Sequence, residues 1–191
     1  IVADTGSEKV RGYFLGLGIG LDRNIEIFRD AGLKTQEGIW VNEYLETSHP
    51  DVWAAGDVAE FTDLILGGQR IDGTWTNAVL QGKVAGENMA WKRTALRTVS
   101  TYSISNLGFY VTLVGSTLVG TGMSDIIRLW PREAGYERLF FQGDVLAGAI
   151  LINRFRDKTP ITRLIEEKLS LGSVKDKFSD PSFDVHSLIH P

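Results

Sequence analysis

Three glycines near the start of the chain, Gly16, Gly18 and Gly20, have a spacing that could serve nucleotide binding. Glycines between an apolar run and a helix let a backbone approach a pyrophosphate. The dinucleotide fingerprint also needs a third glycine three residues after the second. Leu21 and Arg23 occupy that place in the two possible registers. We therefore favour a glycine-rich turn without a nucleotide contact over a phosphate-binding loop.

A second candidate for ligand binding is the stretch VWAAGDVAEF, residues 52–61. Its apolar residues predict a short buried strand that ends at Gly56, so Asp57 would stand at the strand's C-terminal end, where ligands of open α/β sheets bind. A carboxylate there could accept hydrogen bonds from sugar or ribityl hydroxyls. By itself, Asp57 is equally consistent with an ordinary surface turn.

The sequence of residues 74–93 predicts the best helix of the chain, capped by Thr74 or Thr76. Its start, Thr74-Trp75-Thr76, offers unpaired backbone N–H groups and a positive dipole end that can hold negative charge on a ligand. One face is nearly bare, and we expect it to press against a sheet or another helix. The small residues of that face are Ala78, Gly82 and Gly86.

Other kinds of catalytic or metal chemistry find little support. The chain has no cysteine, which excludes thiolate nucleophiles and Cys-ligated metals within it. His186 and His190 are four residues apart, a spacing that could bind a metal on a helix, but they lie beside Pro191 and we favour a frayed tail. We expect no catalytic residue and no metal site in this chain.

Composition restricts the partners of the chain. Its 191 residues suffice for one ordinary domain or two small ones, and 20 basic against 24 acidic residues give a net charge of −4 without a basic run. Without a basic run, a nucleic-acid partner is not supported. A membrane partner is not supported either, since no apolar stretch reaches spanning length and no signal peptide is recognisable. We expect a cytoplasmic location. The chain starts at Ile1 without a methionine, so we expect a fragment or a processed chain.

The elements of the first half alternate between strand and helix. The patterns predict strands over 12–19, 38–46 and 51–58, a short helix over 24–33 that stops at Gly32, and a glycine-rich loop before the long helix. Composition shifts over residues 92–101, which we take as a domain boundary. The predicted domains are therefore residues 1–96 and 97–191.

The second half reads as β-rich. Strands are predicted over 109–119, 125–130, 136–142 and 145–154, with a tight hairpin at 142–144. A helix follows over 159–171, with Thr159 as its cap and Pro160 in its first turn. The stripe expected to be buried on that helix consists of Ile161, Leu164, Ile165 and Leu169.

Residues 38–90 resemble the last part of the FAD-binding domain of pyridine nucleotide–disulfide oxidoreductases. Within that superfamily they are most similar to NADH:rubredoxin reductases and the FAD module of assimilatory nitrite reductases. The matching motifs are Thr47-Ser48, the Ala-Ala-Gly-Asp that ends at Asp57, and the helix segment from Ala78 through Gly82, Lys83 and Ala85.

The resemblance implies a cofactor site. In the family, the matching Asp binds the ribityl and pyrophosphate region of FAD, and the start of the matching helix lies by the flavin pyrimidine edge, where its dipole stabilises negative charge. The residues that inherit cofactor-binding roles by this resemblance are Gly56, Asp57, Val58, Thr74, Trp75 and Thr76.

Residues 103–115, 136–154 and 161–171 resemble the family's C-terminal domain more loosely. That domain packs on the flavin domain and often forms the dimer interface. The fold implied is mixed α/β and α+β, with the C-terminal portion of a Rossmann-like FAD-binding domain followed by a β-rich interface domain. A homodimer is expected by the same resemblance.

The function implied is that of a fragment of a flavoprotein oxidoreductase, which passes electrons from NAD(P)H through FAD to an acceptor such as a small redox protein. NAD(P)H would bind outside this chain, on the rest of the same polypeptide, and the fragment alone would be inactive. The alternative is a non-catalytic interaction or oligomerisation module, whose interface could use some of the five tryptophans.

The resemblance also gives the opening glycines a different place. Members of the family cross back from the NAD domain to the FAD domain through an apolar strand and a turn of the type A-x-G-x-x-P-N. Asn24 fits the end of that turn, whereas Arg23 stands where the proline usually is. This stretch is thus expected near the flavin by its backbone at most.

Overall fold

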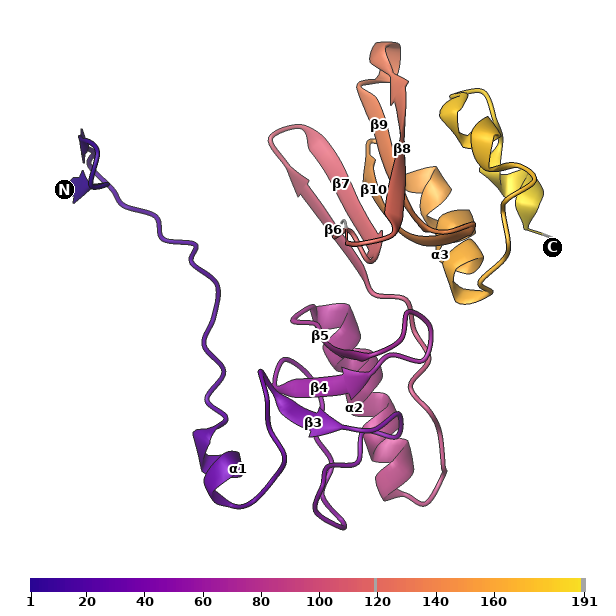
Figure 1. Ribbon diagram of the computed structural model, residues 1–191. Helices are drawn as coiled ribbons and strands as arrows, with labels where there is room; N and C mark the ends of the chain where they lie inside the picture. The colour runs from indigo at the N-terminus through magenta and orange to yellow at the C-terminus, as the bar shows by residue number, and fades with distance from the viewer. Residues whose placement is uncertain (119, 190–191) are drawn as a thin grey trace.

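The computed structural model describes residues 1–118 and 120–189. Along the chain, an N-terminal hairpin and an extended arm precede a small α/β unit, and a larger β-sheet unit follows (Figure 1). None of the helices in the described part of the chain is long and apolar enough to cross a membrane. The domain boundary at residue 96 remains a prediction.

The N-terminal hairpin pairs β1 (Val2–Asp4) with β2 (Lys9–Arg11) in antiparallel fashion. Residues 12–25 then form no regular structure, so the strand predicted over 12–19 is wrong. Apolar side chains along this arm stay exposed, Phe14 by 94% and Ile19 by 90%. An apolar strand needs a partner strand and a covering layer, and the described residues supply neither to the arm (Figure 1).

The small α/β unit begins with α1 (Glu26–Asp30), which ends before Gly32, a residue with φ +87, as the sequence predicts. Its sheet has the order β3-β4-β5. The strands are β3 (Ile39–Val41), β4 (Ala59–Thr62) and β5 (Gln69–Ile71). The strand β3 runs parallel to β4, and β5 runs antiparallel to β4. The loop predicted before the long helix therefore contains a strand, and the strand predicted over 38–46 is much shorter.

The long helix α2 (Trp75–Met89) packs against this sheet through a largely polar face. Its N-cap is Thr74, whose hydroxyl accepts a 3.3 Å hydrogen bond from the Asn77 N–H. Of the two caps that the sequence offers, Thr74 or Thr76, the structure has Thr74. The buried residues are Asn77, Gln81, Ala85 and Asn88. Gly82 and Gly86 are exposed and face open space. The expectation that the small-residue face presses on another element is therefore wrong within the described part of the chain.

The larger unit is a five-stranded antiparallel sheet with the order β6-β7-β10-β9-β8. Its strands are β6 (Thr101–Asn106), β7 (Phe109–Gly115), β8 (Met123–Trp130), β9 (Gly135–Gln142) and β10 (Val145–Ile152). Strands are confirmed at all four predicted places, as is the hairpin at 142–144. The strand predicted over 109–119 already ends at Gly115 and the one predicted over 145–154 ends at Ile152, while Val119 lies outside the described residues. A turn at Leu107 and Gly108, both with positive φ, divides residues 101–115 into two strands.

The helix α3 (Lys158–Glu166) covers one face of this sheet (Figure 1). Ile161, Leu164 and Ile165 are fully buried, as the stripe predicts, while Leu169 lies beyond the helix end and is only partly buried. The predicted cap is wrong. The helix starts at Lys158 after Asp157, so Thr159 lies inside the first turn and its hydroxyl caps no helix N–H.

Shortening Leu164 tests the importance of this helix. Leu164→Ala should lower the free energy of unfolding by about 2–5 kcal/mol, because a fully buried leucine leaves a cavity in the core. Thr159→Ala on the same helix should change it by less than about 0.5 kcal/mol, since the side chain is exposed and caps nothing. Urea denaturation measures both. A loss near 1 kcal/mol for Thr159→Ala would restore it as the cap.

The C-terminal segment is ordered by two short helices, η3 (Lys175–Ser179) and η4 (Val185–Leu188). Phe178 is fully buried and its ring meets that of Phe141 edge-on, with 5.6 Å between the centroids. The expectation of a frayed tail is therefore wrong for residues 185–188, because apolar contacts hold them. His186 contacts Asp157, with 3.3 Å between Nε2 and Oδ1. His190 and Pro191 lie outside the described residues.

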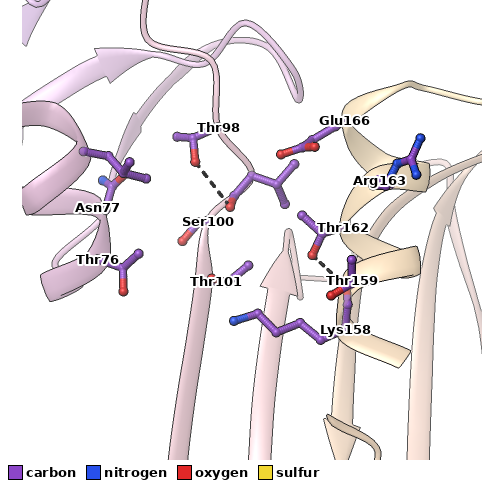
Figure 2. Close-up of a pocket in the computed structure, with 12 residues that line it drawn as sticks. Thr76, Asn77, Thr98, Ser100, Thr101, Lys158, Thr159, Thr162, Arg163 and Glu166 are labelled. Atoms are coloured by element: carbon purple, nitrogen blue, oxygen red, sulfur yellow. Dashed lines mark hydrogen bonds between the residues drawn. The ribbon is translucent and has the colours of Figure 1, made fainter. Parts of the chain in front are cut away.

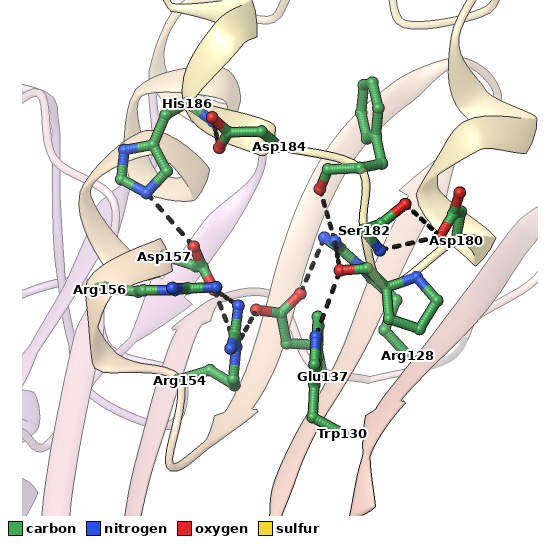
Figure 3. Close-up of polar contacts among 12 residues, drawn as sticks. Arg128, Trp130, Glu137, Arg154, Arg156, Asp157, Asp180, Ser182, Asp184 and His186 are labelled. Carbon is green, nitrogen blue, oxygen red and sulfur yellow. Dashed lines mark hydrogen bonds and ion pairs between the residues drawn. The ribbon is translucent and has the colours of Figure 1, made fainter. Parts of the chain in front are cut away.

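A buried charge cluster joins this C-terminal segment to the sheet (Figure 3). Arg128 Nη1 lies 3.1 Å from Glu137 Oε2, and Arg154 Nη2 lies 2.7 Å from Asp157 Oδ2. Arg128 also donates to the backbone carbonyl of Phe183 at 2.6 Å. All four ionisable side chains are at most 5% exposed. The cluster therefore ties β8, β9 and the start of α3 to the C-terminal segment.

Glu137 should make stability depend on pH. Burial, together with a hydrogen bond to Asp157, raises the pKa of Glu137 from 4.5 to about 8, against the opposite effect of Arg128. The folded chain therefore holds a proton that the unfolded chain has released, and stability should fall as pH rises from about 5 to about 8. Urea denaturation across this range should show that decline. Glu137→Gln, which cannot ionise, should flatten it; an unchanged slope would contradict this assignment.

Candidate functional site

The candidate site is built on the turn Gly56–Val58, which leads into β4. Gly56 has φ +84, a conformation that favours glycine. The Ala59 N–H closes the turn by donating to the Gly56 carbonyl at 3.0 Å. Residues 52–56 form no strand, since Trp53 makes only an isolated bridge to Glu46. The prediction that Asp57 follows a strand is therefore wrong, because Asp57 precedes β4 instead.

Asp57 nevertheless lies beside the start of α2. A Cβ placed on Gly73 would be 3.8 Å from Asp57 Oδ2, so the carboxylate adjoins the residue just before the N-cap Thr74. The Asp57 side chain is exposed. Its carboxylate receives no hydrogen bond from residues 1–118 or 120–189 and is free to accept hydrogen bonds from a ligand.

The N-terminus of α2 presents donors next to this acceptor. The Thr74 hydroxyl is used by the cap, whereas the N–H groups of Trp75 and Thr76 find no acceptor among the described residues. The first N–H groups of a helix lack intrahelical partners and carry its positive dipole end. The Trp75 side chain is 88% exposed and leaves the site open. The site thus combines a carboxylate acceptor with backbone donors.

Val58 has a more restricted role. Its carbonyl accepts a 2.7 Å hydrogen bond from the Ile39 N–H, while its own N–H donates to none of the described residues and is available to a ligand. A side chain at Gly38 would come within 2.6 Å of that same carbonyl, so Gly38 is needed for the close approach of β3. All six predicted site residues thus come from two adjacent segments.

A cavity of about 310 Å³ extends from the start of α2 to the larger unit (Figure 2). It lies between α2, residues 98–100 with the start of β6, and α3, and six of its twelve lining residues carry a hydroxyl group. Those hydroxyls belong to Thr76, Thr98, Ser100, Thr101, Thr159 and Thr162. Ser100 donates to the Asp72 carboxylate, which ties residues 98–100 to the loop before α2. Of the six predicted site residues, Thr76 alone lines this cavity, so the cavity adjoins the site at the start of α2.

Sequence reasoning missed two side chains that contact the turn. Gln81 is fully buried in α2, and its Oε1 accepts the Gly56 N–H at 2.7 Å. Arg23 belongs to the opening glycine-rich stretch, and its Nε donates to the Asp57 carbonyl at 2.7 Å. A polar residue inside the matched helix motif could have pointed to Gln81, while no pattern pointed to the Arg23 contact.

Comparison with known proteins supports the family resemblance. The sequence profile of the family described as pyridine nucleotide-disulphide oxidoreductase matches residues 2–82. A relative in Photorhabdus laumondii, the ferredoxin–NAD(+) reductase component of 3-phenylpropionate/cinnamic acid dioxygenase, is 29% identical over 171 residues, covering 86% of this chain and 41% of the relative. An NADH-rubredoxin oxidoreductase of Clostridium acetobutylicum is 37% identical over 70 residues, 37% of this chain and 17% of that protein.

Solved structures agree on the fold. The crystal structure of the covalent putidaredoxin reductase–putidaredoxin complex matches with a TM-score of 0.85 and 21% identity, over 95% of this chain and 42% of the matched chain. The predicted mixed α/β class is confirmed. The chain spans about two fifths of the length of the first of these relatives and of this structure. Over residues 2–82, the chain is thus similar to the pyridine nucleotide-disulphide oxidoreductases.

Proposed function

We propose that the chain is the C-terminal part of an FAD-dependent NAD(P)H oxidoreductase and forms one wall of its FAD site. Residues 1–96 would complete the FAD-binding domain and residues 97–191 would form the interface domain. The observation that carries the proposal is the juxtaposition of the unpaired Asp57 carboxylate with the open N-terminus of α2. Taken alone, this chain would be inactive.

The residues present suit the chemistry of FAD. Asp57 can accept hydrogen bonds from ribityl hydroxyls, because its carboxylate makes no other hydrogen bond to the described residues. The N–H groups of Trp75 and Thr76 can face the electronegative edge of the flavin ring, with the helix dipole adding to their effect. Gly56 lets the backbone turn beside Ala78, whose Cβ would lie 3.7 Å from a Cβ at that position.

The chain's own residues would therefore bind and orient the cofactor. When bound, FAD supplies the hydride and electron transfer between NAD(P)H and an acceptor. The fixed backbone donors of α2 would hold negative charge at the flavin without a proton donor. NAD(P)H would bind to the rest of the polypeptide.

We extend the proposal to partners and location. A small redox protein is the acceptor class we favour, since a relative is named a ferredoxin–NAD(+) reductase component and a similar structure is a reductase complex with putidaredoxin. The larger unit would form a homodimer, and the protein would work in the cytoplasm. Sedimentation of the full-length protein, with and without a ferredoxin or rubredoxin, tests both kinds of association.

Anaerobic titration of the full-length protein tests the proposed activity. NADH or NADPH should bleach the visible absorbance of bound flavin, and a ferredoxin or rubredoxin should restore it. A flavin-containing protein that neither nucleotide reduces would contradict the oxidoreductase. A protein purified without flavin, and unable to take it up, would favour the non-catalytic interaction module instead.

A further inference from the structure

Two side chains fix the Gly56–Asp57 turn from different directions. Gln81 holds the Gly56 N–H and Arg23 holds the Asp57 carbonyl, each at 2.7 Å. The turn therefore has a side-chain partner on both of its residues, although its own Asp57 side chain makes no hydrogen bond within the described part of the chain. The orientation of Asp57 thus depends on contacts to its backbone.

Gln81 contacts the turn from helix α2. Its side chain is fully buried in α2, one turn of helix after Asn77, so it has little freedom to move. Its Oε1 accepts the Gly56 N–H, whereas its Nε2 has no partner among the described residues. A buried amide N–H without a partner lowers stability. The hydrogen bond that Oε1 accepts from Gly56 explains why a glutamine nevertheless occupies this position.

Arg23 acts from the opening segment. It lies two residues before Ile25, which is buried in the core of the small unit, and the Ile25 N–H donates to the Arg23 carbonyl at 2.8 Å. The arm is thus anchored where Arg23 reaches the turn.

We infer that Arg23 and Gln81 are positioning residues, which hold the Gly56–Asp57 turn so that the Asp57 carboxylate points to its ligand. This inference rests on the proposed function. A binding group held in place before the ligand arrives loses less conformational entropy on binding. Neither residue needs to touch the ligand, and their effect on binding passes through Asp57.

A double-mutant cycle in the full-length protein tests this inference. Arg23→Met removes the donor and Arg23→Lys retains a cationic donor, and each is combined with Asp57→Asn. Arg11→Met is the matched control, since Arg11 is exposed and its side chain makes no hydrogen bond or ion pair with the described residues. The affinity for FAD and the thermal midpoint of the FAD-free protein are measured for every variant. Gln81→Met is measured in the same way, provided that circular dichroism shows it to be folded.

Arg23→Met should weaken FAD binding about 10-fold, and Arg23→Lys should recover part of the loss. The loss should disappear when Arg23→Met is combined with Asp57→Asn. The thermal midpoint of FAD-free Arg23→Met should equal that of FAD-free Arg11→Met. Unchanged affinity in Arg23→Met would overturn the inference while leaving the proposed function intact. A loss that persists in Asp57→Asn would overturn it by indicating direct ligand contact or a general effect on the fold. A wild-type protein that binds no FAD would overturn the inference together with the proposed function.

Discussion

Replacing Asp57 with alanine in the full-length protein should weaken FAD binding by about 10- to 100-fold, because the site loses its charged acceptor for ligand hydroxyls. The fold should be unaffected, since the Asp57 side chain is exposed and receives no hydrogen bond from the described residues. Fluorescence titration of FAD into the FAD-free protein measures the affinity directly.

The matched control for this prediction is Asp30→Ala. Asp30 is an exposed acid at the end of α1 and lies outside the candidate site. It should retain wild-type affinity, which separates the loss of a specific acceptor from a general change in charge. Equal affinities for Asp57→Ala and wild type would mean that the carboxylate does not contact FAD.

The largest expected effect on stability comes from the buried charge cluster. Arg154→Leu should lower the free energy of unfolding by about 3–5 kcal/mol, because removing one partner of a buried ion pair leaves uncompensated charge. Arg154 is 4% exposed, with its Nη2 2.7 Å from Asp157 Oδ2 and its Nε 3.5 Å from Glu137 Oε1 (Figure 3). Its Cζ also lies 3.8 Å from the centroid of the Trp130 ring. Urea denaturation of the purified chain measures the loss.

Arg156→Leu provides the comparison. Arg156 is 70% exposed and lies 3.7 Å from the same Asp157 carboxylate. Exposed ion pairs contribute less than about 1 kcal/mol, so this variant should stay close to wild type. Similar losses for the two variants would mean that burial of Arg154 does not govern the energetics of the cluster.

Local signals in the sequence predicted some elements well. The Thr74 cap lies within one turn of the residues it serves, and β8, β9 and β10 have eight residues each, which is long enough for a strand to be recognised locally. The short strands β3, β4 and β5 have three or four residues and depend on pairing across the chain. Their boundaries could not be predicted from local pattern.

The candidate site shows the same limit. The resemblance named both segments of the site, but it placed Asp57 after a strand, whereas the turn is set by Gly56 and by contacts to distant residues. Gln81 reaches it from 25 positions along the chain and Arg23 from 34. The polar buried face of α2 also hides the helix orientation, because a pattern search looks for apolar residues on the buried side.

The FAD content of the full-length protein tests the central claim most directly. Extraction and quantification of flavin from the purified protein should give one FAD per polypeptide, after incubation with excess FAD if some is lost during purification. A protein that is folded by circular dichroism and still retains no FAD under these conditions would contradict the assignment of Asp57 and the α2 N-terminus to a flavin site.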